Sequence, residues 1–208
     1  MNQLKNRSFM VILLAILLAV PFGFVFPNQV NAASKNKKAH KAFEKKIESI
    51  KSDCISYSYK YADVIGDSTH EMLVDYHTGL NGSGHDFKIY AYKNKRAKCI
   101  YKEILYGLSK ITVYKKAKSM ILYNSGHGGE SYSYIKSKNG KFKFIASKSR
   151  IAVNGGSTYN GPWQYGVYKG SPTKKNFKKL TKNMKKGKKK VISSSGWNEG
   201  EGYKDFDE

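Results

Sequence analysis

Short β-type segments alternate with tight turns from residue 57 to residue 146, and this pattern leaves few folds open. Phe87, Ile89 and Ala91 alternate with polar residues along one of these segments. Asn139 and Gly140 separate two others, and Asn-Gly is the strongest short signal for a β-hairpin. A chain of 208 residues is too short for a propeller of four-stranded blades. We therefore expect an antiparallel β-meander, either an open sheet or a small sandwich, with strands at 57–63, 71–77, 86–93, 97–105, 111–114, 120–123, 130–136, 141–146, 163–168 and 191–192.

Two segments instead have apolar residues at helical spacing. In residues 38–52 the apolar stripe contains Phe43, Ile47 and Ile50. A second helix is expected to open at Pro172-Thr173 and to end at Gly187, with Phe177, Leu180 and Met184 as its buried stripe. The predicted fold class is therefore α+β and mostly β, with one helix before the meander and one near its end.

The first 32 residues have the pattern of a secretory signal peptide. Lys5 and Arg7 precede an apolar run over residues 9–20, and Val30-Asn31-Ala32 is a small-residue cleavage site. A retained membrane anchor is the alternative, although the apolar run is short for a span. We expect a signal peptide at 1–32, a disordered leader at 33–37, one β-rich domain at 38–192 and a flexible acidic tail at 193–208. Such a protein is secreted and extracellular or wall-associated, as in a Gram-positive cell.

The chain is strongly basic, with a formal net charge of +23, and its cations are nearly all lysines. Only Arg96 and Arg150 follow the signal peptide, and arginine is the residue preferred for bidentate phosphate recognition. This composition favours diffuse attraction to a polyanion, such as an anionic cell-wall polymer or a membrane surface, over sequence-specific nucleic-acid binding. The alternative is that the lysines only keep a tyrosine-rich surface soluble.

An acidic loop joins the first two predicted strands. Asp63, Asp67 and Glu71 recur at every fourth residue, and Gly66 supplies a tight turn. A hard cation such as calcium needs several oxygen ligands on a chain that folds sharply back on itself. This spacing supplies part of such a ligand set.

Residues 63–74 also resemble the Asp-x-Asn-Gly-Asp-Gly-x-x-Glu-Leu-(Ile/Val) loop of secreted Firmicutes proteins, which is shared with the calcium-binding repeats of integrin-like, VCBS-type (FG-GAP-like) domains. The resemblance implies a structural calcium ion held by Asp63, Asp67, the Thr69 carbonyl and Glu71. Ile65 stands where the family has a ligand, and Ser68 stands where it has glycine. Any calcium affinity implied by the resemblance is therefore weak, as in extracellular modules.

Cys54 and Cys99 are the only cysteines. An even number of cysteines outside the cytoplasm favours a disulfide, which would tie the entry of the first strand to the fourth. Two separate buried thiols are the alternative.

Sixteen tyrosines lie mostly at strand positions, where an apolar ring with a hydroxyl suits a half-exposed sheet face and also stacks on sugars. A carbohydrate-binding face is one interpretation, and ordinary strand propensity is the other. The residues of that face would be Tyr90, Tyr92, Tyr132, Tyr134 and Trp163.

The sequence contains no motif that pairs a nucleophile with a general base. His77, His85, His127 and Glu130 lie near glycine-rich turns, where they would converge as a transition-metal site or simply border the turns. The favoured function is a non-catalytic extracellular binding module. The alternatives are a hydrolase or accessory domain for cell-wall polymers, with His127 and Glu130 as the candidate residues, and a cationic protein retained at the wall by charge alone.

Overall fold

The computed structural model describes residues 27–79, 84–126, 128–153 and 159–203. The chain divides into two compact units, residues 1–37 and 38–208. In the first unit, the described residues form the beginning of helix α2 (Pro27–Lys51). This helix is longer than the sequence indicates, because it includes the residues expected to form a disordered leader. Most of the predicted signal peptide lies outside the described residues, and within them no helix combines the length and apolarity needed to cross a bilayer.

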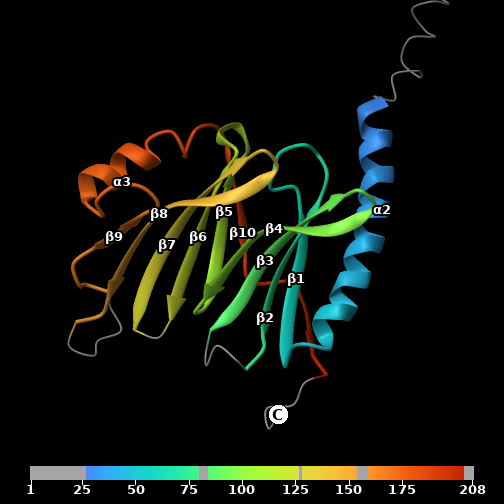
Figure 1. Ribbon diagram of the computed structural model, residues 1–208, viewed down its shortest axis with the longest axis horizontal. Helices are drawn as coiled ribbons and strands as arrows, with labels where there is room; N and C mark the ends of the chain where they lie inside the picture. Colours follow the sequence, from blue (N-terminus) through green and yellow to red (C-terminus); the bar gives the residue numbers. More distant parts are fainter. Residues whose placement is uncertain (1–26, 80–83, 127, 154–158, 204–208) are drawn as a thin grey trace, which may run out of the picture. The chain divides into compact units, whose positions relative to one another are not determined.

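The second unit contains two antiparallel sheets, as the hairpin pattern predicts (Figure 1). Sheet A has the strand order β11-β1-β2-β3-β4, and sheet B has the order β10-β5-β6-β7-β8-β9. The strands of sheet A are β1 (Ser56–Ala62), β2 (Glu71–His77), β3 (His85–Lys93), β4 (Arg96–Leu105) and β11 (Asn198–Glu201). Those of sheet B are β5 (Leu108–Tyr114), β6 (Ser119–Gly126), β7 (Gly129–Lys138), β8 (Lys141–Ile151), β9 (Gln164–Val167) and β10 (Lys189–Ser193). The predicted class, α+β and mostly β, is confirmed.

The main core lies between the two sheets. Leu73 and Phe87 of sheet A pack in one buried cluster with Met120, Leu122 and Ile135 of sheet B. All five side chains are completely buried, and burying a side chain of this size contributes about 1.5–3 kcal/mol. Successive side chains of a strand point to opposite faces, so the neighbours of these residues point outward.

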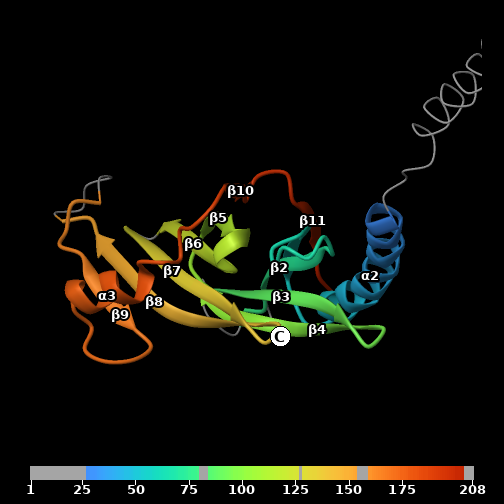
Figure 2. The same cartoon turned by 90° about the horizontal axis from the view of Figure 1, so that it is seen from above.

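The outward faces of both sheets are also apolar, and a helix covers each of them (Figure 2). Phe43 and Ile47 of α2 pack against Met72 and Val74 on the outer face of sheet A. On sheet B, the outer face packs against α3 (Lys174–Thr181) through Phe177, whose ring meets Tyr134 edge-on at 5.2 Å between centroids. Helix α3 begins after its cap Thr173, as predicted, but ends at Thr181, before Gly187.

Two hairpin turns have the left-handed backbone that two-residue connections require. Asn139 and Gly140 have φ angles of 52° and 67°, and Asn94 and Lys95 have 51° and 61°. Since the turn type fixes the register of its hairpin, these residues set the pairing of β3 with β4 and of β7 with β8.

The predicted disulfide between Cys54 and Cys99 is wrong, because both cysteines are free. Cys54 is fully buried in the cluster beneath α2. Cys99 is exposed on β4, next to the bulge between Ile89 and Tyr90 on β3, and its Sγ lies 3.1 Å from the carbonyl oxygen of Tyr101. An even number of cysteines does not determine where their side chains point.

The predicted flexible tail contains a strand. Residues 198–201 pair with β1, and Trp197 is buried in the main core with its Nε1 donating to the carbonyl oxygen of Ser193 at 2.7 Å. The tail was predicted to be flexible because its composition is polar. That composition gives no indication that Trp197 is buried or that the tail pairs with the open edge of β1.

Thiol labelling tests the free cysteines. Without reductant, the native protein should expose one fast-reacting thiol, and the unfolded protein should expose two. Burial raises the pKa of the Cys54 thiol, so it should react slowly until the protein unfolds. A Cys99→Ser variant should lose the fast reaction. Absence of any reactive thiol after unfolding would show that a disulfide had formed.

Candidate functional site

The acidic loop between β1 and β2 is held by hydrogen bonds from its backbone N–H groups to its own carboxyl groups. Glu71 Oε2 accepts hydrogen bonds from the N–H groups of Val64 at 3.0 Å and Ile65 at 3.2 Å. Asp63 accepts from the N–H groups of Gly66 at 2.6 Å and Ser68 at 3.3 Å. These bonds fold the loop tightly enough that Ser68, at the position where the resembling family has glycine, takes a left-handed φ of 65°.

Lys115 supplies a positive charge to this loop from the connection between β5 and β6. Its Nζ lies 2.5 Å from Asp63 Oδ2. Burial alone would raise the pKa of Asp63, but the bonds from Lys115 and from the Gly66 and Ser68 N–H groups outweigh it, and the pKa lies below its ordinary value. Asp63 is therefore the ionised partner of an ammonium group.

Glu71 behaves differently, although it belongs to the same loop. Its side chain is almost completely buried, and this burial raises its pKa to about 8, against the opposing effect of the Val64 and Ile65 N–H groups. The neighbouring charges of Asp67 and Asp63 raise it further. At neutral pH, Glu71 is thus largely protonated.

The three carboxylates predicted to bind calcium already accept hydrogen bonds. Asp67 Oδ1 accepts from the Thr69 N–H at 2.9 Å, and the carboxylates of Asp63 and Glu71 bind backbone N–H groups and Lys115. In the described part of the chain, no group of three or more His, Cys, Asp or Glu side chains converges as a metal site. Calcium binding at Asp63, Asp67, Thr69 and Glu71 stays a prediction to be tested.

The predicted tyrosine face is divided among separate parts of the fold. Tyr90 and Tyr92 belong to the cluster beneath α2, and Tyr134 is buried against Phe177 of α3. Tyr132 packs in the same cluster as Tyr134, and its ring centroid lies 5.9 Å from that of Trp163. These tyrosines mainly pack helices onto sheets, as strand propensity alone would allow.

Tyr132 and Trp163 are covered by cations on the outer face of sheet B. Lys148 Nζ lies 3.8 Å from the Trp163 ring centroid, and the Arg150 guanidinium lies 4.6 Å from it. Arg150 Nε also donates to buried Glu130 at 2.5 Å. Glu130 of the predicted hydrolytic pair is therefore ion-paired, and its partner His127 lies outside the described residues.

The remaining histidines form two pairs. His40 Nε2 and His70 Nδ1 lie 3.0 Å apart, and burial lowers the pKa of His40. His77 and His85 stack at 5.2 Å, and His85 also faces Asp75 at 3.5 Å. His40 of α2 therefore contacts a histidine of the acidic loop.

The topology gathers lysines in a way that sequence reasoning missed. In an antiparallel meander every second connection lies at the same end of the strands. The connections after β1, β3, β5 and β7 and the segment around α3 meet at one end, which we call the lysine-rich end (Figure 1). Its lysines are Lys93, Lys95, Lys115, Lys116, Lys118, Lys138, Lys141 and the eleven lysines of residues 169–190.

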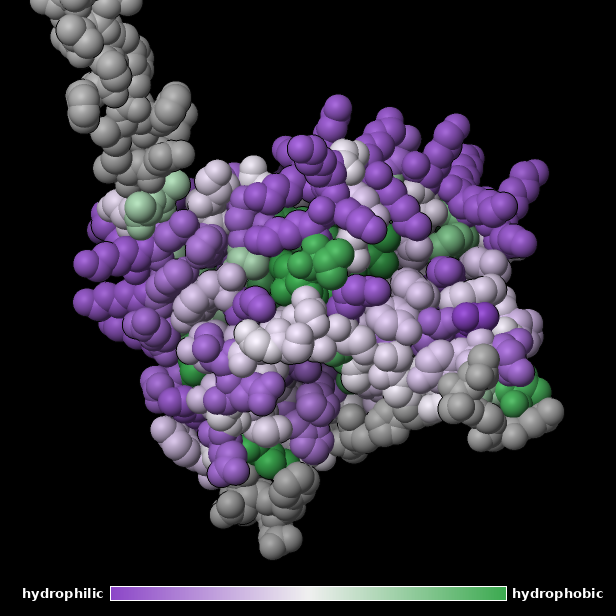
Figure 3. All heavy atoms as spheres, turned by 180° about the vertical axis from the view of Figure 1, so that it is seen from behind, coloured by the Kyte–Doolittle hydropathy of each residue, from purple (hydrophilic) through white to green (hydrophobic). Residues whose placement is uncertain are grey.

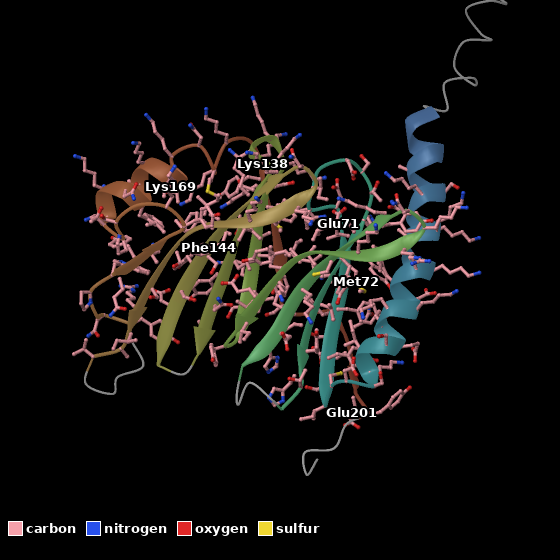
Figure 4. The ribbon with its side chains drawn as sticks, viewed as in Figure 1. Glu71, Met72, Lys138, Phe144, Lys169 and Glu201 are labelled. Carbon is pink, nitrogen blue, oxygen red and sulfur yellow. The ribbon has the colours of Figure 1, made fainter. Side chains whose placement is uncertain are left out.

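The opposite end has a different chemistry. The connections at 78–84, 106–107, 127–128 and 152–163 contain no lysine and are rich in glycine. Figure 4 shows Lys138 near the first end and Glu201 near the second. In Figure 3, long hydrophilic side chains project along the upper edge of the molecule, above the turns. The sequence signal was available: apart from the acidic loop at 63–70, every second turn carries lysines.

No family model, curated protein or solved structure matches the chain.

A Glu71→Gln variant tests the protonation of the acidic loop. Because the pKa of Glu71 is about 8 in the folded state and 4.5 in the reference state, ionisation opposes folding between these values. Wild-type stability should fall relative to Glu71→Gln by about 3 kcal/mol between pH 4.5 and pH 7. Denaturant unfolding across this range measures the difference. Glu48→Gln, a control at an exposed position, should show no such trend. If the difference in unfolding free energy between the wild type and Glu71→Gln does not change with pH, Glu71 is not protonated in the folded state.

Calcium is tested by thermal unfolding with millimolar calcium and with chelator. If Lys115 is the cation of the loop, calcium should not change the unfolding temperature, and Lys115→Gln should cost about 1 kcal/mol, since the lysine is half exposed. A calcium-dependent rise that disappears in Asp67→Ala would instead establish the calcium site, because a ligand that binds only the folded state must stabilise it.

Proposed function

We propose that this protein is a secreted, non-catalytic interaction domain that binds an anionic cell-wall polymer through its lysine-rich end. The observation that carries the proposal is the clustering of lysines at the end of the strands that also holds the acidic loop. Residues 169–190 contain eleven lysines and no Asp or Glu, and all eleven are exposed. Within the described residues, only Lys115 of the lysine-rich end makes an ion pair with a carboxylate.

Clustering changes what the lysines do. Charges that only keep a protein soluble can be spread evenly, whereas cations gathered on one end sum to a local field that attracts a polyanion. Their ammonium groups are flexible point charges without the planar geometry that reads a base edge. One of the two arginines that follow the predicted signal peptide, Arg150, is bound to Glu130. A repeating anionic polymer fits this surface better than a specific nucleic-acid sequence.

Co-sedimentation with purified Gram-positive wall sacculi tests the proposal. The protein should bind sacculi that carry their anionic polymers and should be lost from sacculi stripped of them. Binding should weaken steeply with added salt, because exposed charges are screened over about 8 Å at 0.15 M and about 3 Å at 1 M. Equal binding to stripped sacculi would contradict the proposal. Preference for vesicles of anionic lipid would identify a membrane surface instead.

Two triple variants with the same net charge locate the binding surface. Lys178, Lys179 and Lys182 are exposed at the lysine-rich end, and changing all three to Gln should weaken binding and flatten its salt dependence. The matched control changes Lys38, Lys41 and Lys45, exposed on α2, to Gln and should bind as the wild type does. Equal losses in both variants would show that net charge alone drives binding.

A further inference from the structure

A small cavity opens between the two sheets at the end opposite the lysine-rich end. It has a volume of about 230 Å³ and lies between the end of β4 and strands β6, β7 and β8. This volume equals that of roughly eight liquid water molecules. It is below the usual range for whole drug-sized ligands and is suited to one small ring.

The wall of the cavity on sheet B is a row of small polar side chains. Asn124, Ser131 and Ser149 occupy neighbouring positions across β6, β7 and β8. Toward the core, Ser133 Oγ donates at 2.7 Å to Glu103 Oε1, which reaches across from β4 of sheet A. Tyr101 donates to the other oxygen of Glu103. The apolar inter-sheet core therefore ends in a layer of hydroxyls, an amide and a carboxylate.

One atom of this layer has no partner. Asn124 is only 7% exposed, and its Nδ2 donates to Ser131 Oγ at 3.1 Å. Its Oδ1 is buried and accepts no hydrogen bond from any described residue. A buried acceptor left unsatisfied destabilises the fold, so such an atom calls for an explanation. A donor on a bound molecule satisfies it once the Asn124 amide turns toward the cavity, because Oδ1 has almost no solvent-accessible surface as it stands.

The rim of the cavity is apolar. Ile104, Tyr106 and Ile151 are 47%, 51% and 62% exposed, and all three line it. Exposed apolar side chains gathered at one place often mark a binding site, whereas scattered ones need no explanation. The site thus offers a polar floor and an apolar, partly aromatic rim.

We propose that this cavity binds one neutral sugar residue. A sugar ring presents hydroxyl groups, which both donate and accept, and C–H faces that pack on Tyr and aliphatic side chains. An anionic ligand is disfavoured: no lysine lines the cavity, Glu103 contributes a carboxylate, and the lining Arg150 is bound to Glu130. The inference is independent of the lysine-rich end, because the two surfaces lie at opposite ends of the strands.

Saturation-transfer NMR on the purified protein tests the proposal with the methyl glycosides of glucose, galactose and N-acetylglucosamine. At least one should bind at millimolar concentration, and its binding should persist in high salt. Asn124→Leu should weaken this binding roughly tenfold or more. Its unfolding temperature should not fall below that of the wild type, because the change removes the unsatisfied acceptor. A purely structural Asn124 would give the opposite result, a lower unfolding temperature with unchanged binding.

Two further variants complete the design. Glu103→Gln keeps the shape of the side chain and should also weaken binding, which covers the case in which Asn124→Leu does not fold. Asn183→Leu makes the matched substitution at an exposed position beyond α3 and should leave binding unchanged. The proposal is overturned if none of the three glycosides binds, or if binding is unaffected by Asn124→Leu and Glu103→Gln. Preferential binding of methylammonium, competing with the glycosides, would assign the cavity to cations instead.

Discussion

Every other feature of this fold depends on strands that are apolar on both faces. Met72, Leu73 and Val74 are consecutive and fully buried, so sheet A cannot leave either face to water. Leu73 packs against sheet B, and its two neighbours pack beneath α2. Sheet B is also apolar on both faces, since Leu122 packs in the main core and Ile121 packs on the outer face, which α3 covers. The two helices are therefore structural necessities, and this leaves the ends of the strands as the parts of the second unit on which function can vary.

The antiparallel meander determines which residue types gather at each end of the strands. Because consecutive strands are antiparallel, a residue type placed in alternate connections accumulates at one end of the molecule. Apart from the acidic loop at 63–70, lysine fills one set of connections, and glycine is common in the other. The lysines gathered at one end repel one another, and this destabilises the fold. Exposure to water and salt reduces the repulsion. A long-range attractive surface and a small short-range cavity can then occupy the same domain without interfering with each other.

The sequence predicted the strands, the hairpins and the fold class because these follow from local pattern. The period of two around Phe87 and the Asn139-Gly140 turn need no knowledge of distant residues. The errors concern contacts between distant segments. Cys54 and Cys99 were paired by count, Trp197 was overlooked within a polar tail, and the tyrosines were grouped although helices separate them. For the same reason, neither Lys115 beside Asp63 nor Glu103 beside Ser133 could be predicted, since 52 and 30 residues separate these partners.

The acidic loop illustrates how one distant residue changes the meaning of a motif. A divalent ion would require several ionised carboxylates around it. A single ammonium group from Lys115 balances only one, and the two buried carboxyl groups divide accordingly: Asp63 is ionised and Glu71 holds its proton. The backbone N–H groups that would otherwise lack partners are bound by the same two side chains. The loop therefore keeps the tight turn typical of a calcium site, while Lys115 supplies one positive charge to it from within the chain.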